Sequence, residues 1–152
     1  MAYLKWTKDL DTGIDVIDGQ HRQIVDYINQ LHDAKVTENE QVISKVLGDT
    51  IEYTVSHFGF EETLLEDAGY EFIRPHKKVH ELFIKRINEY KQRFDSGEDV
   101  AEELLDLLSR WLFSHIRNDD AAYVPTVMST LGNMLNDKKP GFLKRSLSKF
   151  FK

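Results

Sequence analysis

The 152-residue sequence contains no cysteine. This absence excludes a disulfide-stabilised scaffold, an iron–sulfur site, a zinc site with thiolate ligands and catalysis by a cysteine nucleophile. A chain of this length fits one domain and can bury a hydrophobic core without cross-links. Any metal chemistry therefore depends on histidine and carboxylate side chains.

Long apolar runs are also missing. No segment approaches the roughly 18 apolar residues of a membrane-spanning helix. The N-terminal segment, MAYLKWTKDLDTG, has no apolar run of the length found in signal peptides. We therefore expect a soluble, cytoplasmic protein.

The net charge of −6 is unevenly distributed. Residues 137–152 hold six basic residues and one acidic residue, a charge of +5, which leaves −11 on residues 1–136. An acidic body argues against nucleic-acid binding as the central function. We divide the chain into residues 1–136, expected to form the folded domain, and a basic tail, residues 137–152.

Apolar residues recur at helical spacing in the first half of the domain. The first helix is expected to begin near Asp18, which is suited to an N-cap position. The second follows the capping-box pattern Thr37-Glu38-Asn39-Glu40 and should end at Gly69. Both segments are long enough to bury one apolar face.

Two further helices are expected in the second half. The third should begin at Pro75, since proline is favoured at the first helical position, and end near residues 95–97. The fourth is the most apolar and carries Leu104, Leu108 and Trp111 along one line. Four amphipathic helices with short connections predict an all-α fold, an antiparallel up-down-up-down four-helix bundle with a short C-terminal extension.

Polar residues that can bind metals occur on the apolar faces of all four expected helices. Burying one such group without a partner costs a few kcal/mol. A single core histidine is usually satisfied by an ordinary hydrogen bond, but here five of the six histidines point inward. This combination favours a shared metal site formed by His21, His57, Glu61, His76, His80 and His115.

The spacing within these helices supports a common site. His57 and Glu61 are four residues apart, as are His76 and His80, so each pair can present both side chains to one point. A further carboxylate follows His115. Asp120 lies five residues later, about 140° off line on a regular α-helix, and reaches the site only if the helix loosens or ends there.

Two assignments stay open on spacing alone. Asp119 is the rival of Asp120 as the carboxylate that joins His115. His32 lies near the end of the first expected helix, where a cationic side chain suits the helix dipole. We interpret His32 as structural or solvated.

The combined motifs resemble those of hemerythrin-type oxygen-binding proteins, of the single-domain bacterial kind. The resemblance covers roughly residues 3–131 and departs from the family pattern at Glu71, where proline is frequent, and in the tail. It rests on Ile17-Asp18-Gly19-Gln20-His21, His57-Phe58, Glu61-Glu62, Gly69-Tyr70, His76-Lys77, His80, Trp111-Leu112, His115-Ile116, Asp120 and Tyr123.

The resemblance implies a centre of two iron ions that share an oxo or hydroxo bridge. Glu61 and Asp120 would also bridge the ions, which favours Asp120 over Asp119. The five histidines would divide unequally, with His76, His80 and His115 on one iron and His21 and His57 on the other.

This ligand set leaves one coordination position open, on the iron with two histidines. The resemblance implies that O2 binds there reversibly, as peroxide. We expect an apolar lining for this position, although the same residues would also serve as ordinary core: Leu112, Trp111, Phe58 and Phe83.

The expected function is reversible O2 binding for storage, buffering or delivery by a monomer, and we expect no enzymatic activity. One alternative is an O2 or redox sensor that acts through a partner protein. Another is a di-iron enzyme that handles peroxide or NO, for which Tyr90 is the nearest redox-active candidate.

The tail, KKPGFLKRSLSKFFK, mixes basic and apolar residues. If it is helical, Leu143, Leu147 and Phe150 share one face with charges beside it. It is therefore a candidate for binding an anionic membrane surface or an acidic protein. The alternative is a C-terminal helix that is frayed or packs back on the protein, without any partner.

Overall fold

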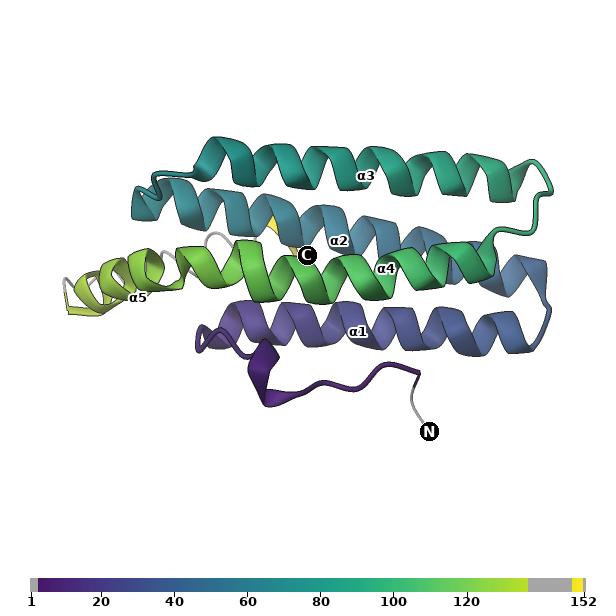
Figure 1. The fold of residues 1–152 in the computed structure, drawn as a ribbon, viewed down its shortest axis with the longest axis horizontal. Coiled ribbons are helices and arrows are strands. Elements are labelled where there is room, and N and C mark those ends of the chain that lie inside the picture. Colours follow the sequence, from purple (N-terminus) through teal and green to yellow (C-terminus); the bar gives the residue numbers. More distant parts are fainter. Residues whose placement is uncertain (1–2, 137–148, 152) are drawn as a thin grey trace.

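The computed structural model describes residues 3–136 and 149–151, and these residues contain no strand. In Figure 1, α1 to α4 lie lengthwise beside one another and α5 continues the direction of α4. α1 and α3 each pack against both α2 and α4, which closes the bundle. The elements are η1 (Lys8–Leu10), α1 (Asp15–Val36), α2 (Glu40–Ala68), α3 (Ile73–Asp95), α4 (Ala101–His115), η2 (Ile116–Asp120) and α5 (Ala121–Asn136). The predicted all-α four-helix bundle is confirmed.

The start of α1 differs from the prediction. The helix begins at Asp15, three residues before Asp18, and its N-cap is Ile14. The Asp18 carboxylate accepts hydrogen bonds from the backbone N–H groups of Thr12 at 2.8 Å and Gly13 at 3.1 Å. Asp18 therefore satisfies the turn that precedes the helix instead of capping the helix itself.

The predicted capping box at the start of α2 is wrong, but its end at Gly69 is correct. Asn39 is the N-cap, and its side-chain oxygen accepts from the N–H groups of Gln41 and Val42. The Thr37 hydroxyl instead donates to the Ala34 carbonyl at the end of α1. Gly69 closes α2 with a φ of 71°, a left-handed conformation that glycine adopts without a steric penalty.

α3 begins at Ile73, two residues before the predicted start at Pro75. Proline is tolerated within the first turn because N–H groups there have no acceptor inside the helix. The fourth predicted helix is divided. Its α-helical part ends at His115, a π-helical turn spans Ile116–Asp120, and α5 follows directly.

Buried apolar residues form two clusters on either side of the predicted metal ligands. On α1, for example, His21 lies between Ile17 of one cluster and Ile24 of the other. The larger cluster extends towards the C-terminal half of α1 and includes Leu104 of α4. The smaller one contains Ile14, Ile17, Phe60, Leu64, Leu65, Tyr70, Tyr123 and Val127. A belt of polar side chains thus crosses the core.

Residues 137–148, most of the predicted basic tail, lie outside the described part of the chain. The proposed boundary after residue 136 therefore stays a prediction. Within the described residues, no helix is both long and apolar enough to cross a membrane.

Candidate metal centre

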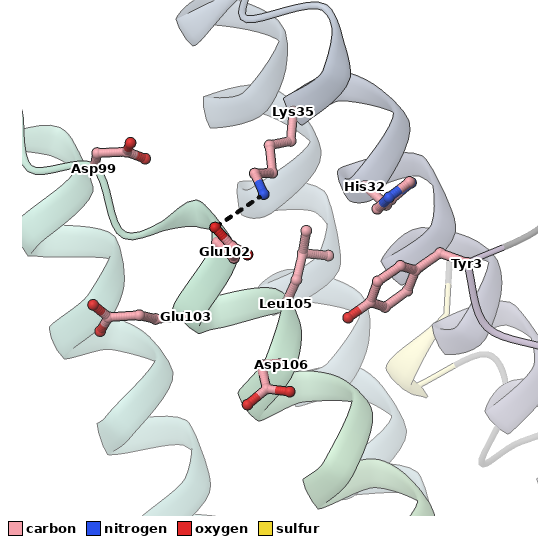
Figure 2. Close-up of a pocket in the computed structure, with 8 residues that line it drawn as sticks. All are labelled: Tyr3, His32, Lys35, Asp99, Glu102, Glu103, Leu105 and Asp106. Atoms are coloured by element: carbon pink, nitrogen blue, oxygen red, sulfur yellow. Dashed lines mark ion pairs between the residues drawn. The ribbon is translucent and has the colours of Figure 1, made fainter.

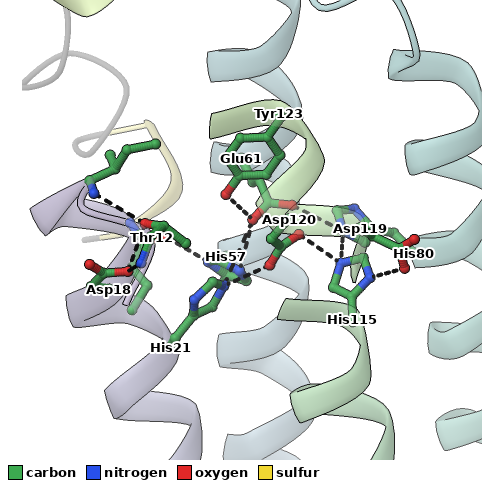
Figure 3. A network of polar contacts seen from close by, with 12 residues as sticks. Thr12, Asp18, His21, His57, Glu61, His80, His115, Asp119, Asp120 and Tyr123 are labelled. Carbon is green, nitrogen blue, oxygen red and sulfur yellow. Dashed lines mark hydrogen bonds and ion pairs between the residues drawn. The ribbon is translucent and has the colours of Figure 1, made fainter. Parts of the chain in front are cut away.

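The structure brings together all seven predicted ligands, and none is more than 4% exposed. Figure 3 labels six of them, all except His76, which converge from α1, α2, α3 and α4 together with the π-turn. They fall into two overlapping groups, and within each group the ligand atoms lie within 4.8 Å of one another. The groups are His76, His80, His115, Glu61 and Asp120, and His21, His57 and Glu61.

Glu61 places one carboxylate oxygen towards each group of histidines. Its Oε1 lies 2.6 Å from His76 Nε2 and 3.2 Å from His80 Nε2. Its Oε2 lies 3.3 Å from His57 Nε2 and 3.9 Å from His21 Nε2. One carboxylate thus reaches both halves of the centre, as a bridging ligand requires.

Asp120 spans the two groups in the same way. Its Oδ1 lies 3.1 Å from His115 Nε2 and 3.3 Å from His76 Nε2. Its Oδ2 lies 3.1 Å from His21 Nε2. The centre therefore contains two carboxylates, each positioned between a three-histidine half and a two-histidine half.

The π-turn explains how Asp120 reaches His115. On a regular α-helix, the side chain five residues on points about 140° away. In a π-helix the hydrogen bonds run from i to i+5, so residue i+5 lies over residue i. The turn Ile116–Asp120 is thus the loosened helix that the spacing requires. Asp119 has another place, because His115 Nδ1 donates to its Oδ2 at 2.7 Å.

Acceptors behind the histidines were not assigned from the sequence. His57 Nδ1 donates to Gln20 Oε1 at 2.6 Å, and His80 Nδ1 lies 3.3 Å from Glu62 Oε2. With the Asp119 contact, each of these acceptors is the sequence neighbour of a predicted ligand. Adjacent helical residues point about 100° apart, so a ligand's neighbour can reach the outer nitrogen of another ring. The position of each acceptor next to a predicted ligand was the one feature of the sequence that could have indicated these contacts.

Tyr123 is a further buried partner of the centre. Its side chain is fully buried, and its hydroxyl donates to Glu61 Oε2 at 3.2 Å. Burial, followed by the nearby charges of Glu61 and Asp120, holds the pKa of Tyr123 well above its usual range. The phenol therefore stays protonated and keeps one Glu61 oxygen in position.

The carboxyl groups of Glu61 and Asp120 are both ionised despite their burial. Burial alone raises the pKa of Glu61, but hydrogen bonds from His57, His76 and His80 outweigh it and lower the pKa well below its usual range. For Asp120, burial and the charge of Glu61 raise the pKa. Contacts with His115 and His21 outweigh both effects, so the pKa lies well below its usual range. Two negative charges in a dry core demand cationic partners.

Protons supply part of that positive charge when no metal is bound. Burial lowers the pKa of His76, but the nearby carboxylates of Asp120 and Glu61 raise it to about 9. The pKa of His115 is likewise lowered by burial and raised, chiefly by Asp120 and Asp119, to about 10. For His57, burial dominates and the pKa is lowered.

The donor atoms fit a metal better than they fit one another. Nε2 of His80 and Nε2 of His115 face each other at 3.0 Å, although both rings have a carboxylate at Nδ1 that favours a proton there. His21 Nε2 and both Asp120 oxygens are buried without an aligned hydrogen bond. Imidazole rings with a proton at Nδ1 present Nε2 lone pairs inward, the form in which histidine binds metals.

Of the four residues predicted to line an O2 pocket, two stack on histidine ligands and two lie in the apolar core beside them. Phe58 stacks on the His80 ring with centroids 3.8 Å apart, and Trp111 stacks on His115 at 4.4 Å. Phe83 in turn stacks on Trp111 at 3.5 Å. Leu112, the fourth, is 4% exposed and belongs to the larger apolar cluster.

His32 lies apart from the centre, about three helical turns beyond His21 on α1. Its ring stacks on Tyr3 at 4.6 Å. Figure 2 shows both residues at the wall of a surface pocket of about 530 Å³, where Lys35 pairs with Glu102 at 3.6 Å. The acidic groups of this pocket form no metal-binding group among the described residues.

Comparison with known proteins agrees with this geometry. Residues 12–127 match the family model described as "Hemerythrin HHE cation binding domain". A bacteriohemerythrin of Pseudomonas aeruginosa is 56% identical over 152 residues, 99% of each chain. One from Methylococcus capsulatus is 34% identical over 127 residues, 82% of this chain and 97% of the relative.

A solved structure extends the agreement to three dimensions. The crystal structure of a wild-type hemerythrin superposes with a TM-score of 0.79 at 32% sequence identity. The match covers 83% of this chain and 98% of the other. The chain therefore belongs to the hemerythrin family, and the relatives it resembles over its whole length are bacteriohemerythrins.

Proposed function

We propose that the buried centre holds two iron ions and binds O2 reversibly, for storage, buffering or delivery. The observation that carries this proposal is the position of Glu61 and Asp120, each of which reaches both the three-histidine and the two-histidine halves. The membership in a cation-binding family supports the presence of metal. Imidazole and carboxylate ligands would also accept zinc, manganese or copper, and iron is proposed here because the chain belongs to the hemerythrin family.

The unequal histidine sets decide where O2 would bind. His76, His80 and His115 would fill one ion, whereas His21 and His57 would leave the other with an open position. When bound, the iron pair would supply two electrons, the number needed to hold O2 as peroxide with its O–O bond intact. The histidine-rich, carboxylate-poor set favours stopping at that stage.

The protein's own residues contribute geometry and dryness. Gln20, Glu62 and Asp119 orient three of the rings from behind, and such outer contacts commonly change metal affinity 10–100-fold. Phe58, Trp111, Phe83 and Leu112 would exclude water from the centre and so slow oxidation of the metal. We propose that these four apolar residues line the O2 pocket.

Two other functions use the same centre. In an O2 or redox sensor the metal state would be read by a partner protein. An enzyme acting on peroxide or NO would need a proton donor or redox-active residue at the open position. Tyr90, the candidate for that role, instead lines a surface pocket with Trp111 and lies against Arg93, 5.2 Å from its guanidinium carbon.

Oxygen titration of the iron-loaded protein tests the proposal. We expect two irons per chain, and a visible charge-transfer band that forms in air, disappears on deoxygenation and returns over repeated cycles. A Glu61→Gln variant should hold less iron and lose the band. A stable ferric product that does not cycle would favour the enzyme, and zinc in place of iron would exclude O2 binding.

A further inference from the structure

The C-terminal residues Lys149–Phe151 lie against the outer face of α2, at Gly59. The approach is so close that a Cβ atom at Gly59 would come within 2.6 Å of the Phe150 ring. Real Cβ atoms do not make such contacts, so a larger residue at position 59 would force the Phe150 ring to shift from this place. Gly59 is thus the floor of a seat for Phe150.

Aromatic residues of α1 and α2 complete this seat. The Phe151 ring lies 5.2 Å from Tyr53 and 6.2 Å from Phe60, centroid to centroid, and Tyr53 lies 5.4 Å from Tyr27 of α1. These spacings are typical of favourable aromatic pairs. The C-terminal pair Phe150–Phe151 therefore extends an aromatic cluster that the bundle already contains.

The charges around the seat match those of the segment that occupies it. The groove beside Phe150 and Phe151 is also lined by Asp49 and Glu52 of α2 and by Lys149. The body of the protein is acidic and residues 137–152 carry +5. An acidic groove with an aromatic floor fits a basic, aromatic segment, and this chain ends in one.

The seat lies directly behind the metal centre. Gly59 is two residues from both His57 and Glu61, and residues two apart on an α-helix point about 160° away from each other. His57 and Glu61 face the core with 1% and 0% exposure, while Gly59 contacts the tail on the outside. Phe150 thus packs on the back of the helical turn that supplies one bridging carboxylate.

The bacterial relatives match different shares of this chain. The bacteriohemerythrins of Pseudomonas aeruginosa and Stenotrophomonas maltophilia match 99% of this chain. The one from Methylococcus capsulatus is matched over 97% of its own length but covers only 82% of this chain. Part of this chain's length is therefore not common to every relative.

We propose that Phe150–Phe151 is a brace that docks within the same chain, on the seat formed by Gly59, Tyr53 and Phe60, and slows metal loss from the centre. The proposal rests on the proposed function in so far as it concerns iron. Docking restrains the outer side of the turn Phe58–Phe60, so His57 and Glu61 leave their ligand positions less often. Undocking the brace increases local opening of α2.

The test compares Phe150→Ala, Gly59→Ala and the double variant with the full-length protein. Release of iron to an excess of chelator should be about five- to tenfold faster in either single variant, which corresponds to about 1.0–1.4 kcal/mol. The double variant should be no faster than the singles, because both changes remove the same contact. Amide hydrogen exchange of residues 57–61 should rise in the same variants.

Matched controls are available in the chain. Phe72→Ala removes a phenylalanine that is 56% exposed, and Gly48→Ala adds a methyl group that meets nothing within 4 Å. Neither should speed iron release or raise exchange at residues 57–61. Because exchange is also measured on the metal-free protein, the brace stays testable even if no iron is found and the proposed function fails.

Two results would overturn the brace. One is iron release and exchange in Phe150→Ala that match the Phe72→Ala control. The other is additive single effects, which would mean that Gly59 and Phe150 act separately. If Phe150→Ala instead lowers co-sedimentation with vesicles of anionic lipid while both readouts stay unchanged, the tail binds membranes and does not brace α2.

Discussion

At the scale of single residues, the centre depends on two adjacent aspartates with different tasks. Asp120 is fully buried and faces Nε2 of His115 and of His21. Asp119 accepts from the opposite nitrogen of His115 and is partly exposed. One imidazole is therefore held between two carboxylates, one inside the proposed metal shell and one outside it.

Asparagine substitutions should separate these tasks. Asp120→Asn removes the charge of a proposed bridging ligand, so we expect the chain to retain at most one of the two proposed ions. Asp119→Asn keeps the inner ligands but weakens the orientation of His115, so two ions should still bind, about 10–100-fold more weakly. Metal content and competition with a chelator measure both outcomes. Equal metal content in Asp120→Asn and the parent would contradict the bridging role.

The raised pKa values of His76 and His115 predict that metal uptake releases protons. At pH 7 both imidazoles are protonated in the metal-free protein, since their pKa values are about 9 and about 10. Metals bind neutral imidazole, so filling the centre at pH 7 should release about two protons from these rings. A pH indicator in weakly buffered solution, with ferrous ion added anaerobically, measures the number.

The same values fix the sign of the pH effect on the metal-free protein. The folded pKa values lie above the unfolded value of about 6.5. This contribution to stability is therefore fully present below pH 6.5 and is lost as the pH rises through 9 to 10. Urea denaturation of the metal-free protein at pH 6.5 and pH 10 should show the decrease, and an unchanged midpoint would contradict the raised pKa values.

At the scale of helices, local irregularities position the ligands. The π-turn Ile116–Asp120 lets two successive carboxylates meet one histidine, which no regular α-helix allows. Gly69 ends α2 soon after Glu61 and lets the chain turn towards Tyr70 and α3. The helices supply the spacing, and these two breaks adapt it to the centre.

Two glycines of α2 should respond in opposite ways to alanine. Gly69→Ala forces a Cβ into a left-handed conformation, which costs about 1–2 kcal/mol. Gly48→Ala lies inside the helix with no atom within 4 Å of the new Cβ, so it should stabilise the fold by about 0.5–1 kcal/mol. Thermal or urea unfolding measures both. If both variants changed the free energy of unfolding in the same direction, the left-handed conformation of Gly69 would not determine the effect of its substitution.

At the scale of the whole molecule, two apolar clusters enclose a polar belt. This arrangement keeps the ligands dry and leaves few large apolar side chains outside. Among the described residues, the exposed large apolar side chains are spread over the segment before α1, over α1, α2, α3 and α5, and the N-cap position of α3. They are Tyr3, Val36, Val42, Val55, Phe72, Leu82 and Met128.

Such scattered residues form no contiguous patch of the kind that stabilises dimers. We therefore predict a monomer in solution. Sedimentation equilibrium over a range of concentrations should give the mass of one chain. A concentration-dependent dimer would contradict the prediction, and repeating the run with Phe150→Ala would show whether the C-terminal pair had exchanged between two copies of the chain.

The sequence by itself determined the helical content, the inward faces and the set of residues that converge. Apolar periodicity is a local property, so His21, His57, His76, His80 and His115 could be placed on core faces without knowledge of the packing. Helix boundaries were less accurate. Thr37 and Asp18 bond to neighbouring segments, a choice that depends on how those segments pack.

Only the tertiary structure decided which groups face one another. Gln20 reaches His57, Glu62 reaches His80 and Phe150 reaches Gly59 across different elements. These contacts depend on the relative rotation and axial offset of the helices, which periodicity does not encode. The family resemblance had already favoured Asp120 over Asp119. Only the π-turn explains how Asp120 faces the centre, because regular helical geometry points it away.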